Sequence, residues 1–326
     1  MSKGVFSKLS GFLSVYSLPI ILVAAFAFFS ILLPTTFPTL FNIKSILNYQ
    51  AVTILISLAV MVPIAAGHFD MSVGYGVCIF HVLAIGLQVN SGLPWPLVIL
   101  LVLAAGAVLG LVNGVLITRV GINSFIATLG VGTILYGIAF WYTDGQQIIG
   151  KLPAGFVKIN SNLAGIPTTA IITLIVAILL WIMLEYTPLG RYFYFLGANP
   201  KAADLSGISV KKYLTLAFIF AGVLTAMASI MLASLLRVGQ ISVGPDYLMP
   251  AFAGSLLGST AIHPGRVNVW GTVSGMLMLA VIISGLQQLG ASYFVEPLFN
   301  GGILIVAVSM AVYAKRRRAT HVDAKE

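Results

Sequence analysis

The sequence predicts an all-α integral membrane protein with about ten transmembrane helices. Of its 326 residues, 59% are hydrophobic and only 8% are charged, and the mean hydropathy is +1.06. Apolar runs recur with a length of about 20 residues, which is the length that crosses the hydrocarbon core of a bilayer as a helix. Helices are the expected spanning elements because each satisfies its own backbone hydrogen bonds in lipid.

The expected spans follow one another along the whole chain, which we therefore treat as one transmembrane domain, 1–326. They cover residues 17–33, 47–66, 70–89, 96–118, 124–142, 167–185, 213–236, 247–262, 267–289 and 293–313. The fourth contains the run AGAVLGLVNG at 105–114, whose small residues favour close helix packing. The eighth is short and rich in glycine and serine, so its boundaries are the least defined.

The net charge of +9 reflects membrane topology and not a nucleic-acid-binding face. If both termini are cytoplasmic, the cytoplasmic loops and ends hold all 17 basic residues except Lys44, Lys151, Lys158 and Arg237. That distribution satisfies the positive-inside rule. It also makes 314–326 a basic cytoplasmic tail, and we expect no nucleic-acid partner.

Motifs for enzymatic chemistry are missing from the sequence. No P-loop, G-x-S-x-G or H-E-x-x-H pattern occurs, and the four histidines are scattered. Cys78 is the single cysteine, so neither a disulfide framework nor a zinc-binding spacing exists. We expect no catalytic residue, no metal site and no cofactor in this chain.

One long polar segment, 188–212, separates the sixth and seventh spans and lies on the cytoplasmic side in this topology. A short helix is expected over 200–205, with Asn199 as its N-cap and Pro200 in its first turn. Ser206 and Gly207 would end it. Such a helix is too short to cross a bilayer and should lie on the membrane surface. The plain alternative is a solvated connecting loop.

The sequence GANPKAADLSGI at 197–208 resembles the cytoplasmic coupling loop of bacterial sugar-type ABC importer permeases, the ribose permease family. In that family this loop docks into the ATP-hydrolysing subunit. The resemblance implies that coupling to the ATPase involves Gly197, Asn199, Pro200, Ala203, Ser206 and Gly207.

A second motif, GHFDMSVG at 67–74, resembles the family hallmark G-G-x-D-L-S-V-G near the translocation pathway. It assigns Asp70, Ser72 and Gly74 to that pathway. His68, Phe69 and Met71 depart from the usual pattern, which puts the usual substrate preference in doubt. The alternative is that Asp70 only caps the third span by accepting backbone N–H bonds.

A third motif, NSFIATLG at 123–130, is similar to the family's P-A-F-I-x-T-L-G. Phe125 and Thr128 are three residues apart and share one helix face. Together they offer a stacking surface and a hydroxyl to a polar solute with an apolar underside. The alternative is that Phe125 packs within the bundle and that Thr128 bonds its own backbone.

A weak internal repeat relates spans 2–5 to spans 7–10. The segments 69–74 and 240–244 share S-V-G before the third and eighth spans, and 121–125 pairs with 290–294 before the fifth and tenth. Because the two groups start on opposite sides of the membrane, a true match would make them inverted repeats. Chance similarity between short glycine- and serine-rich segments is the alternative.

The resemblance extends from the second span to the tenth. It implies a multi-pass permease subunit of the bacterial inner membrane that imports a sugar or sugar-like solute by alternating access. Expected partners are a separate ATPase subunit that hydrolyses ATP, a second permease subunit of the same or a paralogous chain, a periplasmic or lipid-anchored solute-binding protein, and membrane lipid. Ribose, other pentoses, hexoses, polyols and a quorum-signal sugar derivative all stay open as substrates.

Two alternatives to an ABC permease follow from the residues. An ion-coupled secondary transporter of a small polar solute also uses inverted repeats, and it would need a membrane acid such as Asp70 or Glu296. A membrane scaffold or enzyme subunit would have no transport role. Dependence on segment 188–212 distinguishes the ABC permease from both.

Overall fold

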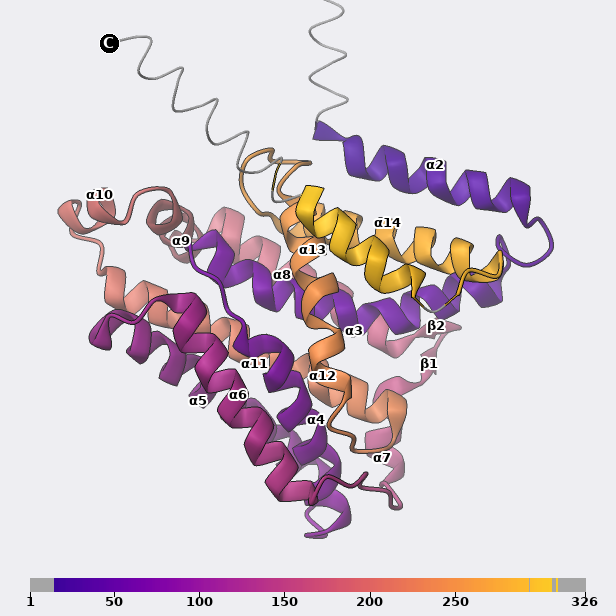
Figure 1. Cartoon of the computed structure of the whole chain (residues 1–326), viewed down its shortest axis with the longest axis horizontal. Coiled ribbons are helices and arrows are strands. Elements are labelled where there is room, and N and C mark those ends of the chain that lie inside the picture. Colours follow the sequence, from indigo (N-terminus) through magenta and orange to yellow (C-terminus); the bar gives the residue numbers. More distant parts are fainter. Residues whose placement is uncertain (1–14, 293, 307–308, 310–326) are drawn as a thin grey trace, which may run out of the picture. The chain divides into compact units, whose positions relative to one another are not determined.

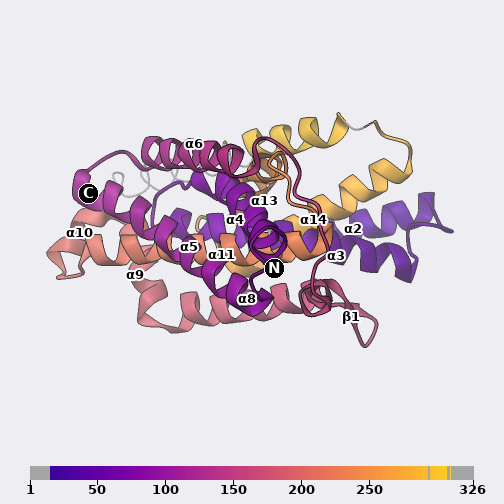
Figure 2. The same cartoon turned by 90° about the horizontal axis from the view of Figure 1, so that it is seen from below.

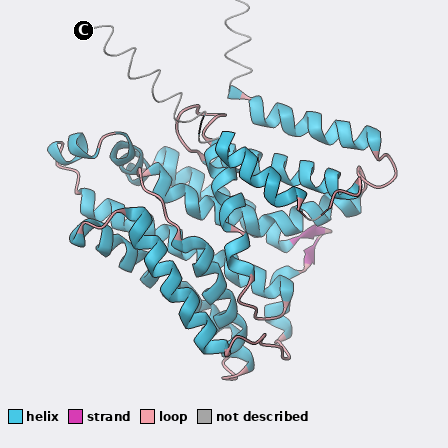
Figure 3. Cartoon of the chain, viewed as in Figure 1, coloured by secondary structure: helices cyan, strands magenta, loops and turns pink. Residues whose placement is uncertain are grey.

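The computed structural model describes residues 15–292, 294–306 and 309. Over these residues the regular structure is helical except for one two-stranded hairpin, as Figure 3 shows. The chain divides into two compact units. One unit comprises Ala51–Leu248, and the other comprises the described residues on either side of it. The expected all-α membrane fold class is confirmed.

Seven helices within the described residues are long and apolar enough to cross a bilayer. They correspond to the second to seventh and the ninth expected spans. They are α3 (Leu40–Ala65), α4 (Ser72–Val89), α5 (Trp95–Val115) with its π-helical continuation η1 (Leu116–Val120), α6 (Ser124–Thr143), α8 (Thr168–Tyr186), α11 (Val210–Leu236) and α14 (Val269–Gln288).

The other three expected spans are not among these seven helices. The first is α2 (Ser17–Leu32), of 16 residues. The eighth, expected over 247–262, is α13 (Leu248–Gly258), of 11 residues, and a separate short helix, α12 (Val243–Asp246), precedes it. The tenth is helical over Val295–Val306. Residues 293, 307–308 and 310–313 of this span and the tail 314–326 lie outside the described residues. The total of ten spans and the cytoplasmic termini stay predictions.

Within the unit Ala51–Leu248, α11 packs most extensively against α5, and Figures 1 and 2 both show the two helices side by side. Glycines make this contact close. A Cβ added to Gly106 would overlap the carbonyl of Gly222, and one added to Gly110 would overlap the carbonyl of Phe218. The tight packing predicted for 105–114 is therefore confirmed, and it depends on backbone meeting backbone.

The segment between α6 and α8 is folded. It contains α7 (Ala154–Val157), η2 (Lys158–Asn160) and the antiparallel strands β1 (Asn162–Leu163) and β2 (Ile166–Pro167). The Ser234 hydroxyl of α11 donates to the Phe156 carbonyl at 2.9 Å and accepts from the Asn160 N–H at 3.1 Å. A β-bridge between Ile148 and Gly239 adds a second attachment. These bonds fix the segment to the end of α11.

The second unit is organised around α14. Helix α2 packs against it, with the Phe29 ring lying directly on Gly285. The turn after α13 is held by Asn268, whose amide donates to the carbonyls of Gly258 at 3.1 Å and Ala261 at 3.0 Å. The same side chain caps α14 by accepting from the Gly271 N–H at 2.8 Å.

Candidate translocation and coupling sites

The loop 66–71 between α3 and α4 contains the centre of a buried polar network. Asp70 is only 2% exposed. Its carboxylate accepts from the Ser72 N–H at 2.9 Å and from the Ser72 hydroxyl at 2.5 Å. The Asp70 side chain therefore accepts the N–H of Ser72, the first residue of α4, while the N-cap position is Met71 and has no side-chain cap bond. Accepting a backbone N–H is the alternative that the sequence offered for this residue.

Asn113 of α5 completes the network and was not singled out from the sequence. Its amide donates to the Ser72 hydroxyl at 2.8 Å, and the residue is fully buried. An amide inside an apolar helix is costly unless it is hydrogen-bonded. An amide among apolar residues was the signal that could have identified Asn113. It was not used, since the run 105–114 was interpreted only through its small residues.

A second bond ties the same loop to α6. The Met71 N–H donates to the Thr128 hydroxyl at 2.9 Å, and that hydroxyl donates to the Ser124 carbonyl at 2.7 Å. Thr128 is fully buried, whereas the Phe125 ring is 46% exposed. The structure thus brings Asp70, Ser72 and Thr128 together around one loop and leaves the Phe125 ring open to its surroundings.

Burial changes the acid–base properties of this loop, which lies between the helical spans. The pKa of Asp70 is raised to about 6, because burial disfavours the charged form more than the two Ser72 hydrogen bonds favour it. Burial also lowers the pKa of His68.

Segment 188–212 begins with a helix that was not predicted, α9 (Pro188–Ala198). Its buried face contains Gly190, Phe193 and Leu196. The Phe193 ring lies 6.4 Å from the Phe220 ring of α11, measured between centroids. Helix α9 is therefore packed against the bundle and does not extend into solvent.

The short helix α10 (Pro200–Leu205) follows, and its expected bounds and cap are confirmed. The Asn199 side chain accepts from the Ala202 N–H at 3.0 Å. Gly207 ends the helix with a φ of +77°, and the Ile208 N–H returns to the Ala203 carbonyl at 3.0 Å. Ala203 is fully buried and attaches α10 to the rest of the segment.

The outward face of α10 has one feature that the sequence analysis missed. Leu205 is 90% exposed, although the helix around it is polar. Lys201, Asp204, Ser206 and Gly207 are also exposed. Leu205 is therefore a single apolar side chain on an otherwise polar, exposed surface. In the sequence, the only signal for this exposed leucine was its position after Ala-Ala-Asp in a short helix whose buried residue is an alanine.

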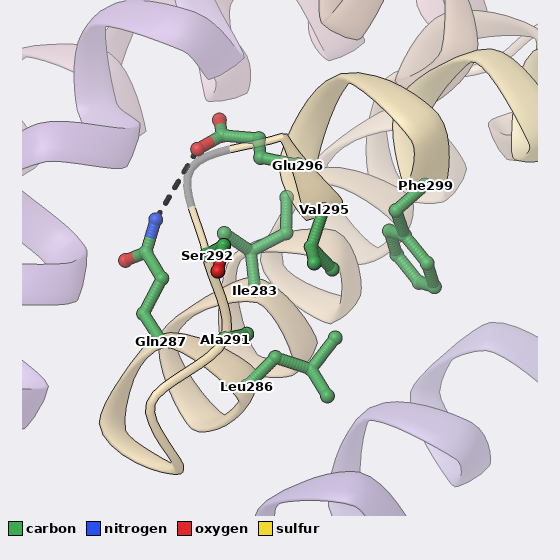
Figure 4. A pocket seen from close by; sticks show the side chains of 8 residues that line it. All are labelled: Ile283, Leu286, Gln287, Ala291, Ser292, Val295, Glu296 and Phe299. Atoms are coloured by element: carbon green, nitrogen blue, oxygen red, sulfur yellow. Dashed lines mark hydrogen bonds between the residues drawn. The ribbon is translucent and has the colours of Figure 1, made fainter.

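The described residues hold no group of three or more His, Cys, Asp or Glu side chains that could bind a metal ion. A small pocket lies between the end of α14 and the helix Val295–Val306. At its rim, Gln287 donates to Glu296 at 3.2 Å, as Figure 4 shows. This pocket contains none of the residues that the sequence motifs singled out.

The chain matches a family model described as "Branched-chain amino acid transport system / permease component" over residues 42–312. The chain belongs to this permease family. The match includes α4 to α14 and therefore both candidate sites. With seven helices of spanning length among its described residues, the permease is a multi-pass protein of the inner membrane.

Curated relatives match the permease over most of its length. The ribose import permease RbsC of Bacillus subtilis strain 168 is 36% identical over 94% of this chain and 92% of its own length. RbsC of Escherichia coli K12 is 31% identical over 89% of this chain and 91% of its own length. The autoinducer 2 import permease LsrD of Escherichia coli SMS-3-5 is 32% identical over 78% of each chain. No solved structure matches the permease significantly.

Proposed function

We propose that this permease is the membrane-spanning subunit of an ATP-driven importer for a sugar or sugar-like solute. The relatives named for ribose and for autoinducer 2 match it over 78% or more of its length. A separate subunit hydrolyses the ATP, and the permease alternates between conformations that open to opposite sides of the membrane. Importers named for two sugar-like solutes support this substrate class without choosing one member.

The observation that carries the proposal is the surface helix α10. It is too short to span a membrane, is capped at both ends, and presents Leu205 and charged side chains to solvent between two spanning segments. We assign this face to the ATPase. Asn199, Pro200 and Gly207 shape the helix, Ala203 attaches it, and Ser206 lies beside the exposed leucine.

The polar loop before α4 is assigned to the translocation pathway. Asp70 and Ser72 fix the start of α4, and Gly74 lies two residues after Ser72 in the first turn. Thr128 joins this start to α6, where the exposed Phe125 ring offers an apolar surface to a passing solute. In this assignment the buried polar groups position the helices, and Phe125 touches the solute.

An internal pseudo-two-fold relation between the two halves is supported by reciprocal contacts. The shared S-V-G motifs equate Gly74 with Gly244 and, four residues on, Cys78 with Leu248. A Cβ on Gly74 would meet the Leu248 side chain at 3.0 Å, and one on Gly244 would meet the Cys78 nitrogen at 2.5 Å. Equivalent residues exchange contacts in this way across a two-fold axis. Inverted repeats with ten spans and cytoplasmic termini are the arrangement that we propose.

The segments before and after α8 indicate where we propose that the remaining partners bind. Its last residue leads into α9 and the ATPase-facing helix, and its first residue follows the hairpin β1–β2. The folded segment 144–167 is therefore proposed to face the periplasmic or lipid-anchored solute-binding protein. A second permease subunit, identical or paralogous, and membrane lipid would cover the exposed apolar helix faces.

The test compares two matched substitutions in complexes purified from native membranes in mild detergent. Leu205→Asp on α10 should abolish recovery of a P-loop ATPase with the permease. Leu163→Asp, at a leucine that is 63% exposed on the hairpin, should leave that recovery intact. Equal recovery with both variants would contradict the docking role of α10.

Uptake provides the second measurement. Gly207→Arg places a large side chain at a positive φ beside Leu205 and should abolish solute uptake while the permease still inserts normally. Full uptake by this variant, or uptake by a permease without any ATPase under an ion gradient, would overturn the proposed function in favour of a secondary transporter.

A further inference from the structure

Two glycines far apart in the sequence bring the two candidate sites into direct contact. Gly67 lies in the loop before α4, and Gly197 lies at the end of α9, immediately before α10. A Cβ added to Gly67 would lie 3.1 Å from the Gly197 Cα. A Cβ added to Gly197 would overlap the Ala65 carbonyl and meet the Gly67 nitrogen at 3.0 Å. Here the two backbones touch with no side chain between them.

The loop that Gly67 belongs to is connected to several spanning helices. Its Met71 N–H is bonded to Thr128 of α6, and Asp70 is linked through Ser72 to Asn113 of α5. The His68 ring lies 6.4 Å from the Phe218 ring of α11, measured between centroids. A displacement of this loop therefore moves the starts of α4 and α6 and presses on α5 and α11.

We propose that the Gly67–Gly197 contact is the point at which movement of the coupling segment enters the transmembrane bundle. Helix α10 docks the ATPase, α9 carries the displacement, and Gly197 passes it to Gly67. The loop 66–71 then passes the displacement to the helix ends around Asp70 and Thr128. This inference rests on the proposed function, since it names the residues that connect ATP hydrolysis to the pathway.

The chemistry of the contact suits this task. Two backbones in contact have no rotamers to change, so side-chain motion does not absorb a displacement that passes between them. Gly197 lies inside α9, where alanine would be favoured by helix propensity. Its presence there is explained by the Ala65 carbonyl and Gly67, which leave no space for a methyl group. Gly197 accordingly faces inward and is a positioning residue, not part of the surface that binds the ATPase.

The test is Gly67→Ala, with Gly121→Ala as its matched control. Gly67 has a φ of +83° and Gly121 a φ of +84°, so both substitutions place an alanine in the left-handed region that favours glycine. A Cβ on Gly121 meets nothing within 4 Å, whereas a Cβ on Gly67 meets Gly197. Any difference between the two variants therefore reports the contact alone.

The measured quantity is solute transported per ATP hydrolysed by the purified complex, reconstituted in vesicles with a solute-binding protein and ribose as probe. We expect Gly67→Ala to keep the ATPase bound and to lower this ratio about ten-fold, a size typical of coupling between sites. Gly121→Ala should retain the wild-type ratio. Gly197→Ala should reproduce the defect. It serves as the second variant if Gly67→Ala folds poorly, because alanine favours the helical conformation of α9.

Three outcomes would overturn the inference: an unchanged ratio in Gly67→Ala and Gly197→Ala, an equal decrease in Gly67→Ala and Gly121→Ala, or loss of the ATPase from the Gly67→Ala complex. The last would limit the contact to holding the docking helix in place. Failure of the wild-type permease to bind any ATPase is a different result, and it would reject the proposed function instead.

Discussion

The cap of α10 allows a sharp prediction about ATPase binding. In Asn199→Ala the Ala202 N–H loses the side-chain oxygen that accepts it at 3.0 Å. Loss of an N-cap costs about 1 kcal/mol. A helix of six residues has no internal reserve against this loss, because helices of fewer than about 12 residues are marginal in water. Ala203 then remains the main attachment of the helix.

If the ATPase binds only the helical form, the cost appears in the dissociation constant. A change of 1 kcal/mol corresponds to a factor of about five in affinity. Binding of the purified ATPase subunit to the permease in nanodiscs, measured by surface plasmon resonance, should therefore weaken by about five-fold in Asn199→Ala. Asn199→Asp is the control, because aspartate caps helices as well as asparagine does. It should bind like the wild type.

The reasoning is refuted in two ways. Wild-type affinity in Asn199→Ala would mean that the cap does not limit the docking helix. Equal weakening in Asn199→Ala and Asn199→Asp would mean that the amide contacts the ATPase directly instead of holding the helix.

Two further predictions concern the bundle. Gly110→Leu should lower the free energy of unfolding by about 3 kcal/mol, because the new side chain overlaps the Phe218 carbonyl. Thermal unfolding in detergent measures this, and Gly130→Leu, where nothing lies within 4 Å, should be nearly neutral; similar losses in both would contradict the packing argument. Asn113→Ala removes the donor to the Ser72 hydroxyl and should cost about 1 kcal/mol and reduce uptake while the ATPase stays bound. Unchanged stability and uptake would show that this bond does not hold the start of α4.

The sequence predicted the starts of helices well where a capping residue precedes the helix. Helix α6 begins at Ser124 as expected, because Asn123 accepts the Phe125 N–H at 2.9 Å. Helix α10 was predicted for the same reason. Helix α9 was missed because glycines at 190 and 197 lower helix propensity, and only tertiary packing shows why they are there. The eighth span was expected to reach residue 262, but α13 ends at Gly258, because hydropathy does not register the turn that follows.

Long-range contacts were beyond what the sequence alone predicts. The roles of Asn113 and of Gly67 depend on partners 41 and 130 positions away, Ser72 and Gly197. A single sequence indicates that a glycine or a buried amide is unusual, but it does not identify the neighbour. The candidate residues on α4 and α10 were therefore predicted one motif at a time, and the contact that joins these motifs emerged only from the structure.

The close approach of α5 and α11 has a mechanical consequence. Sliding one helix along the other by one residue would drive a side chain into a carbonyl at Gly106 or Gly110. The pair is therefore locked against shear, and we expect it to move as a rigid body when the permease changes access. The bending must then occur at the ends of the pair.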